Sequence, residues 1–245
     1  MVIRDLNAIA AAAKEMLDDL LALDFTAECL DANSCEFDDW RDENDIPDYI
    51  GISSGATRFV FWNKNRRDYV YKIQYYDNDE IDYGRAEQET YEEARSRNLD
   101  EYFAWCAKLF DCEISGQTFG VYAMEYVDIF CNHEEASKRY WRYCFNKWCD
   151  RNDFAPDESN EKTVAQFKKE TWVDYCPDQE DMLEFAESEW GEDDAGRVVN
   201  LLNDFGINDC HGGNWGYTKQ NKLVLCDYAG YDIQGGLAYA ECKAG

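Results

Sequence analysis

The sequence predicts an α+β fold in which a sheet-rich lobe precedes a helical lobe. Between residues 50 and 124, runs of aromatic and β-branched residues alternate with polar turns, which is the pattern of an antiparallel sheet. After Val127, apolar residues recur at steps of three and four, which is the pattern of amphipathic helices. A chain of 245 residues is long enough for two small lobes. The change of pattern near Val127 predicts the boundary between them.

Residues 1–48 are expected to form an N-terminal helix and an acidic connector. From Leu6 to Leu23 the apolar side chains follow a helical period, which predicts an amphipathic helix that packs on the body of the protein. From Glu36 to Asp48 acidic residues stand among few aliphatic ones. This composition predicts a solvated connector that ends near Pro47.

Residues 49–127 are expected to form the sheet lobe. The pattern predicts, in chain order, a flexible glycine turn at 51–55, strands at 59–62 and 69–74, a helix at 84–97, and strands at 110–114 and 118–124. The last two strands flank Ser115-Gly116-Gln117, which predicts a tight turn.

Residues 128–245 are expected to form the helical lobe. Acidic or proline-containing loops separate four predicted helices, at 134–149, 162–175, 179–189 and 194–205. A short hairpin is expected near the end of the chain, with strands at 215–217 and 223–226.

The charge of the chain restricts its partners. Lys and Arg number 24 against 52 Asp and Glu, so the formal net charge is −28. Such a field repels nucleic-acid phosphates and anionic lipids, so neither direct nucleic-acid contact nor membrane binding is expected. Basic proteins are the expected macromolecular partners. The alternative is that the excess of acid serves solubility alone.

The cysteines and the apolar segments indicate a reducing, cytoplasmic setting. The 11 cysteines are an odd number and include no Cys-x-x-Cys pair, which favours free thiols. The apolar run of the first predicted helix lacks a basic leader, so it is not expected to be a signal peptide. No uninterrupted apolar stretch approaches the roughly 18 residues that span a bilayer.

Three polar residues near the end of the chain form the candidate chemical centre. The segment that begins at Ile207 closes a helix and opens a hairpin whose second strand leads to Asp227, so Asp209, Asn214 and Asp227 can converge. Phosphoryl transfer needs a carboxylate that orients the attacking hydroxyl, and oxygen ligands that hold Mg²⁺ on nucleotide phosphates. Asp209 suits the first role, and Asn214 and Asp227 suit the second. Taken singly, Asp and Asn at such positions are more often turn or cap residues than catalysts.

The spacing of these residues is similar to that of protein-kinase-like phosphotransferases. Asn214 lies five residues after Asp209, and Asp227 lies thirteen residues after Asn214. Asp209-x-His211-x-Gly213-Asn214 resembles the D-x-H-x-G-N loop of aminoglycoside- and choline-kinase-like enzymes and of compact bacteriophage Ser/Thr kinases. The resemblance implies a bilobal protein-kinase-like fold that binds ATP and Mg²⁺. It also implies that His211 shapes the loop, with a contact to phosphate as the alternative.

The resemblance assigns roles to residues earlier in the chain. The run from Gly51 to Gly55 corresponds to the glycine-rich hairpin that covers the phosphates of ATP, which by itself is a weak signal. Lys72 lies 17 residues beyond Gly55 and is implied to reach the α- and β-phosphates. Glu87 on the following helix is implied to hold this lysine, with Glu89 as the alternative.

The strand that ends at Met124 is implied to lead into the hinge between the lobes. In this interpretation Met124 is the gatekeeper side chain, and backbone groups of Glu125 and Val127 face the adenine of ATP. Without the resemblance, these three residues are an ordinary strand end and linker.

The chain departs from eukaryotic protein kinases in ways that leave the acceptor open. Only 18 residues follow Asp227, no A-P-E motif is present, and Ile207 stands at the first position of the usual H-R-D. Regulation through an activation loop is therefore not expected. The leading hypothesis is a Ser/Thr kinase that acts on a basic protein, in the host cytoplasm if a bacteriophage encodes it. The alternatives are a small-molecule kinase, or a non-catalytic acidic protein that binds a basic partner or mimics nucleic acid.

Overall fold

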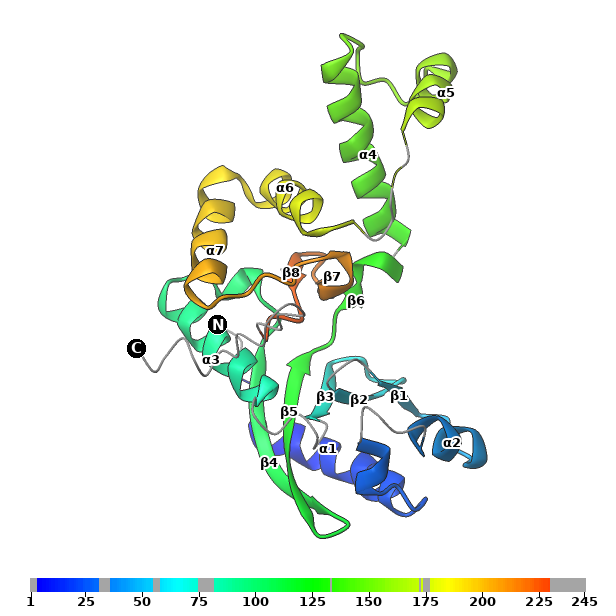
Figure 1. The fold of residues 1–245 in the computed structure, drawn as a ribbon, viewed down its shortest axis with the longest axis vertical. Helices are drawn as coiled ribbons and strands as arrows, with labels where there is room; N and C mark the ends of the chain where they lie inside the picture. The colour runs from blue at the N-terminus through cyan, green and yellow to red at the C-terminus, as the bar shows by residue number, and fades with distance from the viewer. Residues whose placement is uncertain are drawn as a thin grey trace.

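The computed structural model describes residues 4–30, 36–54, 58–74, 82–132, 134–171, 173 and 177–229. Within these residues the protein is an α+β fold, as the sequence predicts, with two antiparallel sheets and seven α-helices. In Figure 1 the larger sheet and the N-terminal helices lie toward one end of the molecule, and the helices that follow residue 133 lie toward the other.

The larger sheet has five strands in the order β1-β2-β3-β5-β4. Their bounds are β1 (Ile50–Ser54), β2 (Arg58–Asn63), β3 (Tyr69–Gln74), β4 (Cys106–Ile114) and β5 (Gln117–Glu125). β4 and β5 are joined at Ser115 and Gly116, whose φ angles of 51° and 80° are both positive. Two positive φ angles suit the twist of a two-residue hairpin, so the predicted tight turn is confirmed.

The strand register divides the side chains of this sheet between two faces. Tyr71 pairs with Phe61 of β2 and Ala123 of β5, and this face packs on the N-terminal helices. Lys72 pairs with Val60 of β2 and Tyr122 of β5. Because side chains alternate along a strand, Lys72 points to the face opposite the N-terminal helices.

The N-terminal region is more structured than the sequence predicts. The expected first helix is present as α1 (Leu6–Leu21), capped by the carboxylate of Asp5. The prediction of a solvated connector is wrong in part, because Glu36–Glu43 forms the helix α2. Phe37 and Trp40 lie on one face of α2 and are buried against the sheet-side core, while the acidic residues face outward. The apolar pair at a spacing of three is the signal for this helix.

The glycine turn is also placed differently from the prediction. Gly51 lies inside β1, directly opposite Trp62 of β2, and is not part of a flexible turn. A Cβ atom at Gly51 would lie 2.2 Å from an indole carbon of Trp62, so the indole ring requires glycine here. Gly55 lies outside the described residues.

The second half of the chain is mainly helical, as predicted. After α3 (Tyr83–Ser96) and the sheet, the helices are α4 (Glu134–Arg151), α5 (Glu161–Glu170), α6 (Gln179–Trp190) and α7 (Glu192–Asp204). α5 ends before its predicted limit because Thr171 is extended and its hydroxyl donates to the carbonyl of Phe167. The smaller sheet consists of β6 (Asp128–Ile129), β7 (Trp215–Tyr217) and β8 (Leu223–Leu225).

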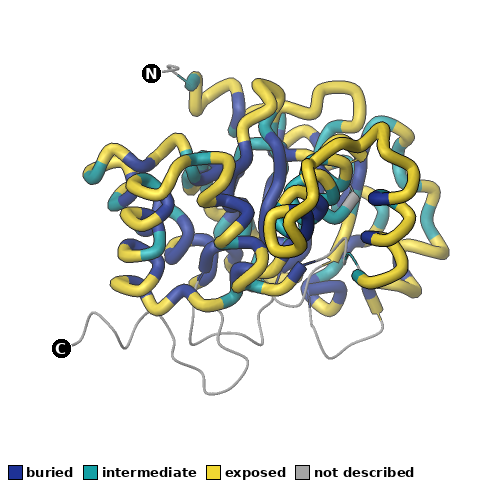
Figure 2. The backbone as a smooth tube through the Cα atoms, turned by 90° about the horizontal axis from the view of Figure 1, so that it is seen from above, coloured by how far each residue is buried: buried dark blue, intermediate teal, exposed yellow. Residues whose placement is uncertain are grey.

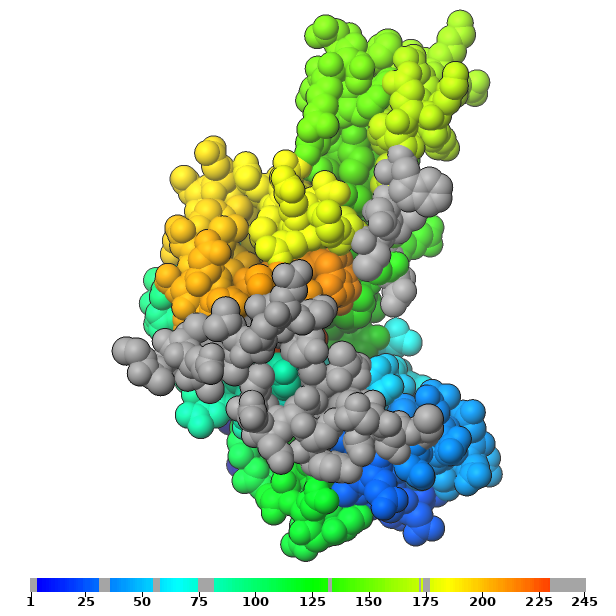
Figure 3. Space-filling view, viewed as in Figure 1, coloured from blue at the N-terminus to red at the C-terminus, as the bar shows by residue number. Residues whose placement is uncertain are grey.

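The buried residues form two large cores and one small one. Figure 2 shows the buried positions along the interior faces of the helices and strands. One large core joins the N-terminal helices to the sheet, and the other joins α3 and the end of β5 to α4, α6, α7 and the smaller sheet. The small core joins α4 to α5, which project from one end of the molecule in Figure 3. Among the described helices, none is long and apolar enough to cross a membrane.

Candidate functional site

A pocket of about 620 Å³ brings five of the ten predicted site residues together. Lys72, Met124, Glu125, Val127 and Asp227 all line it. Its walls come from β1, β2 and β3, from the segment after β5, and from the loops on either side of the smaller hairpin. Residues separated by as many as 155 positions therefore face one cavity.

The sheet supplies one wall through its strand register. Val70 of β3 pairs with Trp62 of β2 and Met124 of β5, so these three side chains share the face on which Lys72 lies. All four line the pocket. Three of these four side chains are apolar, and Lys72 is the cationic one.

Lys72 is held by Glu87 of α3. The lysine Nζ lies 2.9 Å and 3.2 Å from the two carboxylate oxygens of Glu87, and it also donates to the carbonyl of Cys226 at 3.3 Å. The side chain of Glu87 is fully buried. Glu89, the alternative partner, instead pairs with Arg85 on the surface at 2.8 Å. The geometry therefore assigns the lysine partner to Glu87.

Arg58 also joins the site, and the sequence motifs predict no role for it. Its guanidinium lies 2.6 Å from an oxygen of Glu87 and 2.6 Å from Oδ1 of Asp227. The arginine side chain is only 6% exposed. These contacts form a charged network in which cations and carboxylates alternate, in the order Lys72, Glu87, Arg58 and Asp227. The available signal was a lone charge in the apolar strand Arg58–Asn63, at a position that shares the face of Val60 and Trp62.

The neighbouring charges favour the ionised forms of Arg58 and Asp227. Burial alone would raise the pKa of Asp227, but the nearby charges of Arg58 and Lys72 hold that pKa below its usual value. Burial also opposes the charge of Arg58, yet Asp227 and Glu87 raise its pKa. The side chain of Asp227 is 47% exposed, so a carboxylate faces the pocket.

Asp209 and Asn214 lie on a loop that is tied to the segment carrying Asp227. The side-chain amide of Asn214 donates to the backbone carbonyl of Asp209 at 2.6 Å. The backbone carbonyl of Asn214 accepts from the amides of Cys226 at 2.8 Å and Asp227 at 3.3 Å. Because the amide nitrogen of Asn214 is used in this way, its oxygen Oδ1 is the atom suited to a cation. Neither Asp209 nor Asn214 lines the pocket itself.

His211 holds the shape of the same loop. Its Nδ1 accepts the backbone amide of Gly213 at 3.0 Å, and its Nε2 lies 3.6 Å from Oδ1 of Asp209. An imidazole bound to the backbone two residues ahead restricts the turn between Asp209 and Asn214.

Two cysteines border the site without supplying a nucleophile. Burial raises the pKa of both Cys210 and Cys226 to about 12, so both remain thiols at neutral pH. Covalent thiol chemistry is therefore not a property of this pocket.

The donor set fits a metal that arrives with its ligand. In the part of the chain that the structure describes, no three His, Cys, Asp or Glu side chains gather to hold a metal ion. The oxygens of Asp227 and Asn214 are too few for a resident centre. They match Mg²⁺, which proteins commonly bind through one or two carboxylates together with substrate phosphates.

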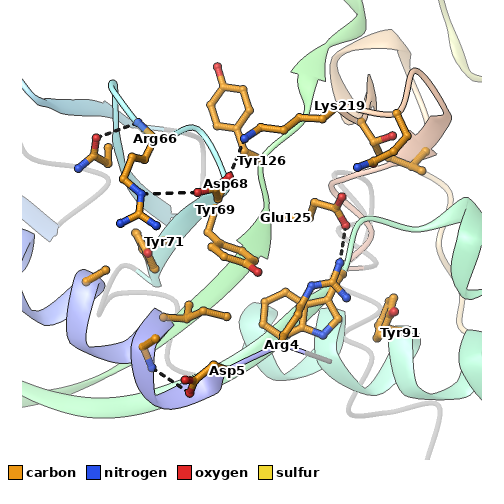
Figure 4. Close-up of a pocket in the computed structure, with 18 of the residues that line it drawn as sticks. Arg4, Asp5, Arg66, Asp68, Tyr69, Tyr71, Tyr91, Glu125, Tyr126 and Lys219 are labelled. Atoms are coloured by element: carbon orange, nitrogen blue, oxygen red, sulfur yellow. Dashed lines mark hydrogen bonds and ion pairs between the residues drawn. The ribbon is translucent and has the colours of Figure 1, made fainter. Parts of the chain in front are cut away.

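A second cavity of about 940 Å³ lies beside the same end of β5 (Figure 4). Glu125 lines both cavities, and its carboxylate pairs with Arg4 at 2.8 Å in this second one. Figure 4 shows Asp68 between Arg66 and Lys219, which pair with it at 3.8 Å and 2.6 Å. Apart from Glu125, none of the ten predicted site residues lines this cavity. The carboxylate of Glu125 is therefore engaged in the second cavity.

Comparison of the chain with protein-family models, curated proteins and solved structures found no match. The resemblance to kinase-like enzymes thus depends on the sequence motifs alone. Six residues make up the arrangement of side chains at this site: Arg58, Lys72, Glu87, Asp209, Asn214 and Asp227.

Proposed function

We propose that the protein is an ATP-dependent phosphotransferase with a bilobal, protein-kinase-like organisation. The observation that carries the proposal is the buried Lys72–Glu87 pair, which Arg58 joins to Asp227 beside the pocket that residues 124–127 also line. Residues 49–127 would form the nucleotide-binding lobe, and residues 128–245 the lobe that carries the catalytic loop. Residues 1–48 would support the first lobe from the far face of its sheet.

The apolar wall of the pocket suits the adenine of ATP. Val70 and Met124 would contact the flat base, which apolar side chains accept without an unpaired polar group. The backbone amide of Glu125 donates to the backbone carbonyl of Trp105 at 2.8 Å, and the backbone amide of Tyr126 donates to the backbone carbonyl of Asp68 at 3.0 Å. Neither amide is therefore free for a ligand. We therefore assign the backbone donor to adenine to Val127, with the carbonyl of Glu125 as the acceptor.

The charged end of the pocket suits the phosphates. Lys72 would bind the α- and β-phosphates, and Glu87 would keep its ammonium group in place. Asp227 and Oδ1 of Asn214 would hold Mg²⁺. The bound Mg²⁺ would neutralise negative charge on the phosphates during transfer. Asp209 would orient the acceptor hydroxyl and accept its proton.

The acceptor that the charge of the chain favours is a Ser or Thr hydroxyl on a basic protein. The net charge of −28 attracts cationic surfaces over several ångströms before contact. The Debye length in physiological salt is about 8 Å, so charges farther than this from the pocket are largely screened. Lys72 and Arg58 would act on an anionic nucleotide at contact distance and would therefore offset the acidic field there.

Nucleotide binding is tested by thermal denaturation with and without Mg²⁺ and ATP. ATP at 100 times its dissociation constant is expected to stabilise the protein by about 2.7 kcal/mol. Lys72→Met should abolish this gain. Lys219→Met, on the surface beside the second cavity, is the matched control and should retain it. If ATP stabilised the wild-type protein neither in the presence nor in the absence of Mg²⁺, the proposal would be contradicted.

Phosphoryl transfer is tested by incubating the protein with labelled ATP and either a cell extract or a basic Ser-containing peptide. Asp209→Asn is expected to reduce transfer by roughly 10² to 10⁴ while nucleotide binding stays intact, because a general base contributes about that factor. Asp227→Asn should instead weaken nucleotide binding in the presence of Mg²⁺. Binding of ATP without transfer to any acceptor would favour the non-catalytic alternative.

A further inference from the structure

One carboxylate oxygen of Asp227 is already bound by a cation of the protein. Oδ1 of Asp227 accepts a hydrogen bond of 2.6 Å from Arg58. The backbone amide of Asp227 is also held, because it donates to the carbonyl of Asn214. The carboxylate is therefore fixed in orientation, with one of its two oxygens committed to the arginine.

Arg58 cannot leave this position without a large cost. Its side chain is 6% exposed, and its other terminal nitrogen lies 2.6 Å from a carboxylate oxygen of Glu87. Glu87 is itself fully buried and bound to Lys72. Moving the guanidinium would leave the fully buried carboxylate of Glu87 and the half-exposed carboxylate of Asp227 each short of a partner, and an unpaired buried charge is strongly unfavourable. The planar, forked shape of arginine suits this bridge between two carboxylates.

The charges of these four side chains balance without any external ion. Arg58 and Lys72 supply two positive charges, and Glu87 and Asp227 supply two negative charges. Protein kinases hold two Mg²⁺ ions with the residues that correspond to Asn214 and Asp227. Here a second divalent ion at Asp227 would meet a guanidinium in contact with the same carboxylate, and like charges at that distance repel.

We infer that Arg58 takes the place of one of the two divalent ions, so that this protein binds ATP with a single Mg²⁺. The inference rests on the proposed function and adds the metal stoichiometry to it. Arg58 acts through Asp227 and is therefore a positioning residue. The single metal ion would be bound by the second oxygen of Asp227, by Asn214 and by the phosphates.

The stoichiometry is measured directly with Mn²⁺, whose free concentration is read by electron paramagnetic resonance. Equal amounts of protein and the non-hydrolysable analogue AMP-PNP are titrated with Mn²⁺, and AMP-PNP alone gives the baseline. The wild-type protein is expected to bind one Mn²⁺ per nucleotide complex. Arg58→Gln, which frees Oδ1 and removes one positive charge, is expected to bind two.

Two further variants separate charge from general disturbance of the site. Arg58→Lys keeps the positive charge and is expected to stay at one Mn²⁺. Arg67→Gln removes another arginine that lines the same pocket but contacts neither carboxylate, and it should also stay at one. These variants are compared only after their melting curves show a folded protein.

The outcomes distinguish the inference from the function on which it rests. Two Mn²⁺ ions on the wild-type protein, or one on a folded Arg58→Gln, would overturn the single-metal inference while leaving nucleotide binding in place. If Arg58→Gln does not fold, the single-metal inference is tested by the number of Mn²⁺ ions bound to the wild-type protein and to Arg58→Lys. Failure of the wild-type protein to bind AMP-PNP at all would overturn the proposed function itself.

Discussion

Glu87 has the most demanding environment of any charged side chain in the pocket region. It is fully buried, and its two carboxylate oxygens are shared between Lys72 and Arg58. A buried carboxylate with two cationic partners compensates the desolvation of all three groups, and its removal leaves two buried cations with one remaining carboxylate. Glu87 would therefore link the proposed nucleotide binding to the stability of the fold.

Glu87→Gln is expected to lower the free energy of unfolding by about 3 kcal/mol, the cost of breaking a buried ion pair from one side. Urea denaturation followed by circular dichroism measures the change. Glu89→Gln, on the same helix but paired at the surface with Arg85, should change the stability by less than about 1 kcal/mol. Equal losses in the two variants would show that the buried network is not what stabilises α3.

At the scale of the element, α2 explains how an acidic segment can be structural. Phe37 and Trp40 contact the core between α1 and the sheet. The ring of Trp40 lies 4.8 Å from that of Phe25, and the ring of Phe37 lies 5.5 Å from that of Phe59. The indole nitrogen of Trp40 also donates to the carbonyl of Leu23 at 2.7 Å. The acidic residues occupy the solvent side, so they add charge without disturbing the packing.

Trp40→Ala is expected to destabilise the protein by about 3 to 5 kcal/mol, because it removes a large buried ring and leaves a cavity. Trp40→Phe keeps most of the buried ring and loses one hydrogen bond, so it should cost less. Asp39→Ala on the exposed side of α2 is the control and should stay within about 0.5 kcal/mol. Thermal and urea melts of the three variants check the order. A solvated connector would tolerate all three changes equally.

The predictability of each element follows from the strength of its local pattern. β3 lies at its predicted position because alternation of aromatic and β-branched residues is a local signal. α2 was missed because its two aromatic residues are outnumbered by acidic ones, and burial depends on contacts with α1 and β2 that are distant in sequence. Gly51 was assigned to a turn because glycine favours turns, whereas its structural reason is the facing ring of Trp62.

The candidate site follows the same rule. Lys72, Glu87 and Asp227 could be proposed from motif spacing, since each is attached to a recognisable strand, helix or loop. The choice of Glu87 over Glu89 needed the side-chain contact. Arg58 could not be assigned from spacing, because its two partners lie 29 and 169 residues away and become neighbours only in the folded protein.

At the scale of the whole molecule, the acidic charge is not spread evenly. The segment 134–171, which contains the projecting helices α4 and α5, has eight Lys or Arg residues and eight Asp or Glu residues, so it is neutral. The entire formal charge of −28 is therefore carried by the rest of the chain, which includes the pocket proposed to bind nucleotide. This part of the molecule would attract a cationic acceptor, and it would repel an anionic nucleotide until the nucleotide reaches Lys72.

Salt should therefore affect the two substrates in opposite directions. Raising the ionic strength from 50 to 300 mM screens the long-range field, and the effect on kcat/KM is expected to be on the order of tenfold for a strongly steered substrate. The kcat/KM for a basic Ser-containing peptide should fall as salt rises, while the kcat/KM for Mg²⁺–ATP should stay constant or rise. A peptide in which every Lys is replaced by Gln serves as the control and should show little dependence on salt. If both substrates lost efficiency to the same extent, the acidic field would have no role in selecting the acceptor, and the preference for basic proteins would have to be abandoned.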